Sequence, residues 1–219
     1  KPKGVLTKIR SDDLVTYIRT ALIIVVAYLV IAKFDAFAII ILLAIAMLSD
    51  AIDGYFAVRE ESNGKIGFIT YVRAATGNKK EWEVVHKIKQ HVSENAPYGP
   101  RIDIAGDRIS EYVLWVTFTF LHIVPLFVLF IIIIRHSFAD ALLGARGTSS
   151  KMHSRIARSL YASNVSRAGI QITKFVTFAY LVLVYVLSYP LWIGYVLIGI
   201  LTAYILIRGI AEIFEALHS

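Results

Sequence analysis

The sequence predicts an all-α integral membrane protein with six transmembrane helices, cytoplasmic termini and a small cytoplasmic insertion between helices 2 and 3. Hydrophobic residues make up 57% of the 219 residues and the mean hydropathy is +0.65, whereas soluble domains contain about 45–50% apolar residues. Several apolar stretches approach the length of about 20 residues that a bilayer crossing requires. Lys and Arg residues gather in alternate connections, as multi-pass proteins require. There is no cysteine, which excludes disulfides and thiolate chemistry.

The predicted helices follow one another along almost the whole chain. They span Leu14–Ala32, Ala36–Phe56, Ile109–His122, Ile123–Ala145, Ile170–Ser188 and Leu191–Phe214. The third is too short for a crossing unless the charged stretch 102–110 belongs to the same helix. Pro125 and Pro190 mark two breaks, and because proline disfavours continuation of the preceding helix, we expect a tight hairpin at each.

The distribution of positive charge predicts the orientation. Residues 1–10, 59–101 and 146–167 contain seventeen Lys and Arg residues, and the connections on the other face contain only Lys33. Positive residues remain preferentially in the cytoplasm, so we expect a multi-pass protein of the cell membrane whose active site faces the cytoplasm. This basic belt would attract membrane lipids with anionic headgroups or anionic substrates, and nucleic acid is not an expected partner.

Two segments flank or interrupt the membrane domain, which we assign to residues 14–219. Residues 1–13 mix apolar and basic side chains, so we expect an amphipathic segment along the membrane interface. Within the insertion, residues 60–98, the composition of 65–74 predicts a strand and 76–78 a turn. Residues 80–95 predict a helix with one apolar stripe, which we expect to pack on the strand or the membrane interface. The stripe contains Trp82, Val85, Ile88 and Val92, and we interpret His86 and His91 as surface residues.

Two pairs of aspartates stand at membrane depth or at its edge. Asp50 and Asp53 share one helical face, and so do Asp103 and Asp107. An ionised Asp inside the bilayer costs about 2.5–3.5 kcal/mol, so four of them require compensating charge. Hard oxygen ligands without cysteine favour Mg²⁺, Mn²⁺ or Ca²⁺, and two ions about 3.5–4 Å apart would suit phosphoryl displacement. The alternative is simple ion pairing at the interface with Arg59, Arg101 and Arg108.

The spacing of these residues resembles that of the CDP-alcohol phosphotransferase family. The family pattern is D-x-x-D-G-x-x-A-R, a spacer, and G-x-x-x-D-x-x-x-D. The matching residues here are Asp50, Asp53, Gly54, Ala57 and Arg59, followed by Gly99, Asp103 and Asp107. Two features depart from the family: Val58 displaces the arginine by one position, and the spacer is lengthened by the insertion.

The resemblance implies a metal-dependent transferase of phospholipid biosynthesis. It would move a phosphatidyl-type group, diacyl or archaeol, from a CDP-linked lipid to a small alcohol acceptor and release CMP. By resemblance, Asp50, Asp53, Asp103 and Asp107 bind two divalent cations, Mg²⁺ or Mn²⁺, and Asp107 is also the catalytic base. The implied CDP-binding residues are Asp50, Gly54, Ala57, Arg59, Gly99 and Asp103. Family members are commonly homodimers, so we expect one here.

Basic residues suggest the acceptor. Arg135 follows an unbroken apolar run, and charges inside a membrane are functional more often than not. With the loop residues that follow, it could bind a phosphate on the acceptor, which favours inositol phosphate or glycerol phosphate over serine or choline. The candidate phosphate-binding residues are Arg135, Arg146, Lys151 and Arg155. Arg19 could reach the lipid phosphate or extend to the headgroups.

Two other classes of function are consistent with the same acids. A cation transporter or channel would use the four aspartates as a permeation site, although the apolar far halves of the second and third helices offer almost no ion path. An inactive membrane scaffold would retain the fold without chemistry, and Val58 is the one motif position that favours it.

Overall fold

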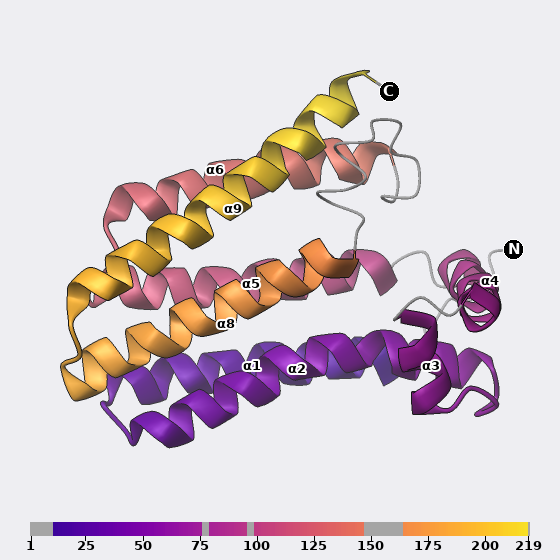
Figure 1. The fold of residues 1–219 in the computed structure, drawn as a ribbon, viewed down its shortest axis with the longest axis horizontal. Coiled ribbons are helices and arrows are strands. Elements are labelled where there is room, and N and C mark those ends of the chain that lie inside the picture. The colour runs from indigo at the N-terminus through magenta and orange to yellow at the C-terminus, as the bar shows by residue number, and fades with distance from the viewer. Residues whose placement is uncertain (1–10, 76–78, 96–98, 147–163, 219) are drawn as a thin grey trace, which may run out of the picture. The chain divides into compact units, whose positions relative to one another are not determined.

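The computed structural model describes residues 11–75, 79–95, 99–146 and 164–218, and all secondary structure in these ranges is helical. This confirms the all-α class. The helices are α1 (Ser11–Ile31), α2 (Ala36–Glu61), α3 (Phe68–Ala75), α4 (Lys79–Asn95), α5 (Gly99–Phe120), α6 (Leu126–Arg146), α8 (Asn164–Leu187) and α9 (Leu191–His218) (Figure 1).

Three helical stretches are long and apolar enough to cross a membrane. In the described part of the chain they are Asp13–Ile31, Ala168–Leu187 and Leu191–Ala211. A fourth exists if Ala36–Ser49 and Gly54–Glu61, which meet at a 40° bend, form one span. These helices are those of a multi-pass membrane protein, but the predicted count of six spans is not confirmed.

Helix α5 joins the two stretches that the sequence left in question. It runs without a break from Gly99 to Phe120, so residues 102–110 belong to the same helix as the apolar stretch that follows. Five of its residues between positions 101 and 111 carry a charge: Arg101, Asp103, Asp107, Arg108 and Glu111. The helix therefore brings charged side chains directly against an apolar segment.

The chain divides into two compact units. The first comprises Lys1–Leu22 and Ile45–Ser110, and the second comprises Ile23–Ala44 and Glu111–Ser219. Helices α1, α2 and α5 each begin in one unit and end in the other.

In the first unit, the insertion packs on the end of α2. Val58, Ala74 and Val85 from α2, α3 and α4 form a buried cluster, against which Ile66, Tyr71 and Ile88 are partly buried. The Tyr55 ring makes edge contacts with Phe68 and Tyr71, at centroid distances of 5.4 and 5.7 Å. Helix α4 confirms the helix predicted at residues 80–95. Val85 and Ile88 of the predicted apolar stripe pack inward. Trp82, predicted on the same stripe, is instead half exposed and stacks on His86 at 4.6 Å. The side chain of Val92 lies outside the described residues, and His91 is exposed as predicted.

The strand predicted for residues 65–74 is wrong, because residues 68–75 form α3. The prediction relied on β-branched and aromatic composition, which tertiary packing readily overrides. A helix places Tyr71 and Ala74, three positions apart, on one face, where they reach Tyr55 and Val58 of α2. The predicted turn at 76–78 lies outside the described residues, as do residues 1–10 of the predicted interfacial segment 1–13. Its residues 11–13 belong to α1.

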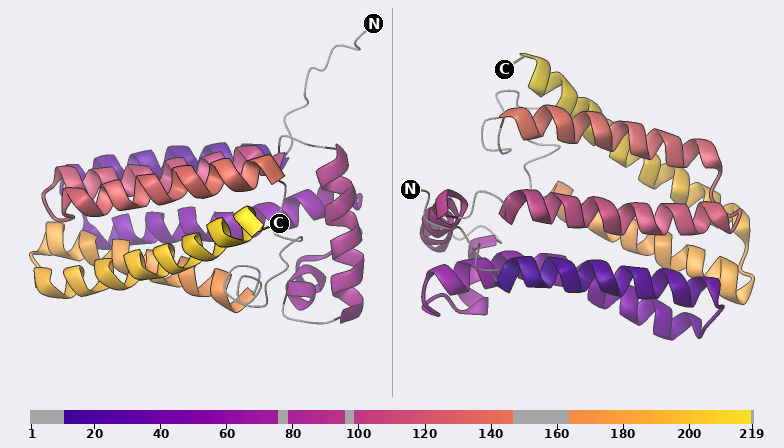
Figure 2. Two further views of the ribbon diagram at one scale, coloured as in Figure 1. Left: turned by 90° about the horizontal axis from the view of Figure 1, so that it is seen from above. Right: turned by 180° about the vertical axis from the view of Figure 1, so that it is seen from behind.

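In the second unit, aromatic side chains fill the space between α5 and α8. The Trp115 and Phe178 rings meet edge to face at 5.1 Å, and Phe118 stacks on Phe178 at 6.1 Å. All three are essentially inaccessible to solvent. Helix α9, yellow in Figures 1 and 2, lies along both α6 and α8. Edge-to-face aromatic pairs contribute about 0.5–1.5 kcal/mol beyond the apolar area they bury.

Both predicted hairpins are present, and left-handed residues terminate the helices before them. His122 and Ser188 have positive φ, as does Lys33 in the turn between α1 and α2. The His122 amide donates to Thr119 O and the Ile123 amide to Phe118 O, a Schellman termination that satisfies the last carbonyls of α5. Helix α6 starts at Leu126, after Pro125, rather than at the predicted Ile123.

Candidate functional site

The described part of the candidate site is formed by two carboxylates of α5 and one arginine of α1. Arg19 Nη2 lies 2.7 Å from Asp107 Oδ1 and donates a hydrogen bond to Asp103 Oδ1 at 3.3 Å. The Arg19 side chain is only 4% exposed, whereas those of Asp103 and Asp107 are 48% and 39% exposed. The i and i+4 spacing therefore does place both acids on one face, as predicted. Arg19 binds both of these acids.

Gly106 lets α1 approach this face of α5. A Cβ atom at this position would lie 3.4 Å from Arg19 Nη2 and 3.5 Å from Thr20 Oγ1, and it would overlap Thr16 Cγ2. Thr16 and Gly106 are both buried. The glycine thus provides the space through which the Arg19 side chain reaches the two carboxylates.

The second aspartate pair is placed only by its backbone. Asp50 and Asp53 belong to α2, three positions apart, and Gly99 is the first residue of α5; the side chains of Asp50 and Asp53 lie outside the described set. Among the described side chains, no group of three or more His, Asp or Glu could hold a metal ion. The prediction of a four-carboxylate metal centre therefore stays a prediction; of its four acids, the structure describes the side chains of Asp103 and Asp107, which lie together.

Three further residues that were predicted to bind CDP lie near the end of α2. Gly54 is partly buried and Ala57 buried, whereas Arg59 is exposed, with its guanidinium 5.9 Å from the Tyr55 ring centroid. Val58 is fully buried against Ala74 and Val85. Packing of the insertion therefore gives a physical reason for an apolar residue at the position where the family pattern has its arginine.

Of the predicted acceptor residues, the structure describes the side chain of Arg135 alone. Arg135 is 8% exposed and donates from Nη1 to His136 Nδ1 at 2.8 Å. Its stem covers Gly209 of α9, where a Cβ would lie 2.7 Å from Arg135 Cγ. It also lines a cavity of about 230 Å³ between α6 and α9 that is otherwise apolar. The side chain of Arg146, and all of Lys151 and Arg155, lie outside the described residues.

A buried polar cluster in the second unit was not predicted. Glu111 of α5 accepts from Lys174 Nζ of α8 at 2.6 Å and from Trp115 Nε1 at 3.3 Å. His136 Nε2 of α6 lies 3.3 Å from Glu111 Oε1. One carboxylate thus links α5, α6 and α8. Glu111 and Lys174 each stand next to an apolar run in the sequence, as Arg135 does. The pattern that predicted a functional role for Arg135 therefore also indicates Glu111 and Lys174.

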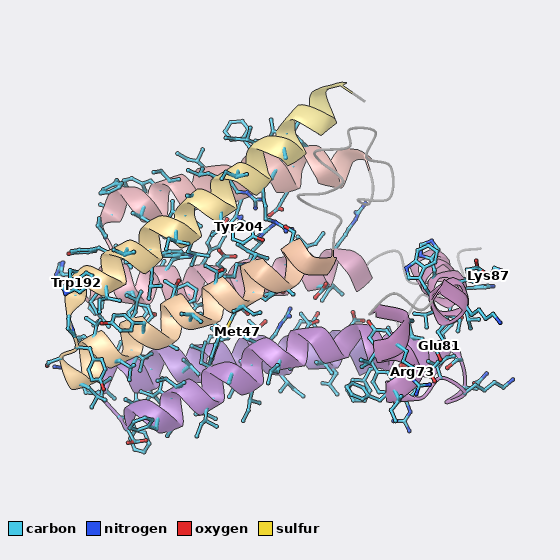
Figure 3. All side chains as sticks on the ribbon, viewed as in Figure 1. Met47, Arg73, Glu81, Lys87, Trp192 and Tyr204 are labelled. Carbon is cyan, nitrogen blue, oxygen red and sulfur yellow. The ribbon has the colours of Figure 1, made fainter. Side chains whose placement is uncertain are left out.

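A second unpredicted group connects α8 and α9. Arg208 is 8% exposed, and its Nη1 donates to Ser166 Oγ at 2.6 Å. The Tyr204 hydroxyl, labelled in Figure 3, donates to the Ser166 carbonyl at 3.0 Å. Two side chains of α9 therefore fix the first turn of α8.

Comparison with known proteins adds no relative. No family model matches the chain, and neither a curated protein nor a solved structure matches it. The family resemblance therefore depends on the motif residues themselves.

Proposed function

We propose that this protein is a CDP-alcohol phosphotransferase, which transfers a phosphatidyl-type group from a CDP-linked lipid to an alcohol and releases CMP. The observation that carries the proposal is the convergence of Asp103 and Asp107 on one cationic nitrogen. Their Oδ1 atoms lie 3.3 and 2.7 Å from Arg19 Nη2. Two carboxylates one helical turn apart whose oxygens reach the same nitrogen support the second half of the motif, because they could approach one metal ion in the same way.

The chemistry of the donor set fits a divalent cation. Carboxylate oxygens are the ligands that Mg²⁺ and Mn²⁺ prefer, and both acids are exposed enough for an ion to reach them. Asp103 and Asp107 would hold the metal from α5, and Asp50 and Asp53 from α2. Bound there, two such ions would neutralise charge on the diphosphate and on the leaving CMP.

The reaction assigns a distinct task to Asp107. The acceptor hydroxyl oxygen forms a bond to the lipid-bearing phosphorus while the bond from that phosphorus to the CMP oxygen breaks. The hydroxyl proton passes to the Asp107 carboxylate, and CMP leaves with the electron pair of the broken bond. General-base catalysis of this kind contributes about 10²–10⁴-fold to a rate.

The proposed acceptor is a phosphorylated polyol, inositol phosphate or glycerol phosphate. The basic residues Arg146, Lys151 and Arg155 support this choice because guanidinium and ammonium groups bind phosphate strongly. Arg135 supports it less, since its stem is buried against α9. A site on the cytoplasmic side and a homodimer remain part of the proposal.

The test is CMP release by the purified protein from CDP-diacylglycerol and from CDP-archaeol, with Mg²⁺ and a panel of acceptors. The panel contains glycerol 3-phosphate, inositol 1-phosphate, free inositol and serine. We expect metal-dependent release with a phosphorylated polyol, and a loss of about 10²–10⁴-fold in Asp107→Asn. Asp35→Asn is the matched control, because Asp35 caps α2 through the Ala38 amide at 2.7 Å and Asn caps equally well. Equal activity of the two variants would contradict the proposal.

Cation transport is a second candidate, favoured by the Glu111 cluster. Ionisable residues buried among apolar helices often mark ion or proton pathways, and Glu111, Lys174 and His136 form such a group in the second unit. Uptake of cations or protons by proteoliposomes of the wild-type protein, independent of CDP-lipid, would support it. Absence of flux together with CMP release would exclude it.

A further inference from the structure

Arg19 occupies the position where a cation shared by Asp103 and Asp107 would be bound. One of its nitrogens, Nη2, contacts Oδ1 of both carboxylates. Mg²⁺ binds carboxylate oxygen at about 2.0–2.1 Å. An ion bridging the same two oxygens would therefore need the space that the guanidinium fills.

The environment of Arg19 makes this contact a fixed feature of the first unit. The side chain is almost fully buried, although the carboxylates it meets are accessible. It passes over Gly106, beside Thr16 and Thr20. A long side chain held in this way loses little further freedom when it binds, so its contact with the two acids is favoured over that of a freely rotating surface arginine.

We propose that Arg19 is a resident counter-cation of the Asp103–Asp107 pair, which competes with the divalent metal and sets the concentration at which the site is loaded. Before loading, the guanidinium neutralises the two acids and keeps them on one face of α5. For a metal to bridge them, Arg19 has to withdraw. This inference rests on the proposed function, because it assumes that the two aspartates bind a divalent cation.

The experiment measures Mn²⁺ binding directly, by the loss of the free-ion paramagnetic resonance signal, with full-length protein in lipid nanodiscs and no substrate. We expect Arg19→Gln to lower the Mn²⁺ concentration for half-saturation by about tenfold, because a like charge within a few ångströms is removed. Arg19→Lys should lower it by about threefold, because an ammonium lacks the planar fork of guanidinium. If Arg19→Gln does not fold, the lysine variant alone decides.

Arg73→Gln is the matched control in the same unit. Arg73 is exposed and lies 3.9 Å from Glu81, both labelled in Figure 3, so its removal should leave half-saturation unchanged. Unchanged or weaker binding in both Arg19 variants would overturn the inference while leaving the proposed function intact. Absence of Mn²⁺ binding in the wild type and in every variant would overturn the metal site, and the inference with it.

Discussion

Replacement of Gly106 by alanine tests the contact that brings α1 to the aspartates. The added Cβ would overlap Thr16 Cγ2, and Thr16 is a β-branched residue with few alternative rotamers. Overpacking a buried contact costs about 1–3 kcal/mol, and we expect the upper part of this range because two helices must separate. Alanine recovers about 0.8–1 kcal/mol of helix propensity over glycine. The expected net loss in the free energy of unfolding is therefore about 1–2 kcal/mol.

A second substitution separates this clash from other causes. Thr16→Ser removes the overlapping methyl group and keeps the hydroxyl, at a cost of about 1 kcal/mol for the lost apolar contact. In the double variant the new Cβ meets its next neighbours, Arg19 Nη2 and Thr20 Oγ1, at 3.4 and 3.5 Å. The alanine gain and the methyl loss then offset each other, so the double variant should be within about 1 kcal/mol of the wild type.

The assay is equilibrium unfolding in mixed micelles, followed by far-ultraviolet circular dichroism for the wild type, both single variants and the double variant. We expect the two losses to be non-additive by about 2 kcal/mol, as for residues in direct contact. Additive losses in the free energy of unfolding, or a double variant less stable than Gly106→Ala, would refute the assignment of Gly106 as the point where α1 and α5 approach most closely.

Two further predictions concern the buried residues that sequence reasoning missed. Glu111→Gln should destabilise the second unit by about 3 kcal/mol, the lower end of the range for a broken buried ion pair, because Lys174, which is 16% exposed, loses its carboxylate. Unfolding in mixed micelles should show the loss, and Asp35→Asn, which keeps the cap of α2, should show at most a small one. Val58→Arg, which introduces arginine at the position where the family pattern has it, should destabilise the packing of the insertion by burying a charge against Val85. Hydrogen exchange in α4 should then accelerate while exchange in α9 is unchanged, and equal protection in both forms would show that the insertion does not depend on position 58.

The long helices and hairpins could be predicted because their signals are local. Pro125 and Pro190 stop helices by their own geometry, and the i and i+4 spacing of Asp103 and Asp107 determines their shared face. Residues 109–122 are too few for a membrane crossing, so a crossing here required residues 102–110 to belong to the same helix, as they do in α5. Helix α3 could not be predicted from composition, because its conformation depends on contacts with Tyr55 and Val58 of another helix.

The partners of the charged residues could not be predicted, because they are distant in sequence. Arg19 and Asp103 are 84 positions apart, and Lys174 and Glu111 are 63 apart. Arg59, Arg101 and Arg108 are close to the aspartates in sequence, but nothing in the sequence indicates that Arg19 of α1 contacts Asp103 and Asp107. Periodicity identifies the face on which a side chain lies, and only packing determines which helix meets that face.

The link among α5, α6 and α8 has a consequence for biosynthesis. Glu111 leaves the ribosome 63 residues ahead of Lys174, an interval of about 3 to 13 s at 5–20 residues per second. During that time the glutamate must remain hydrated or be met by His136, the earlier of its two partners on other helices to be synthesised. The second unit therefore completes its charge balance only once α8 has emerged, and a chain truncated before Lys174 would expose to quality-control proteases an acid that the finished protein conceals.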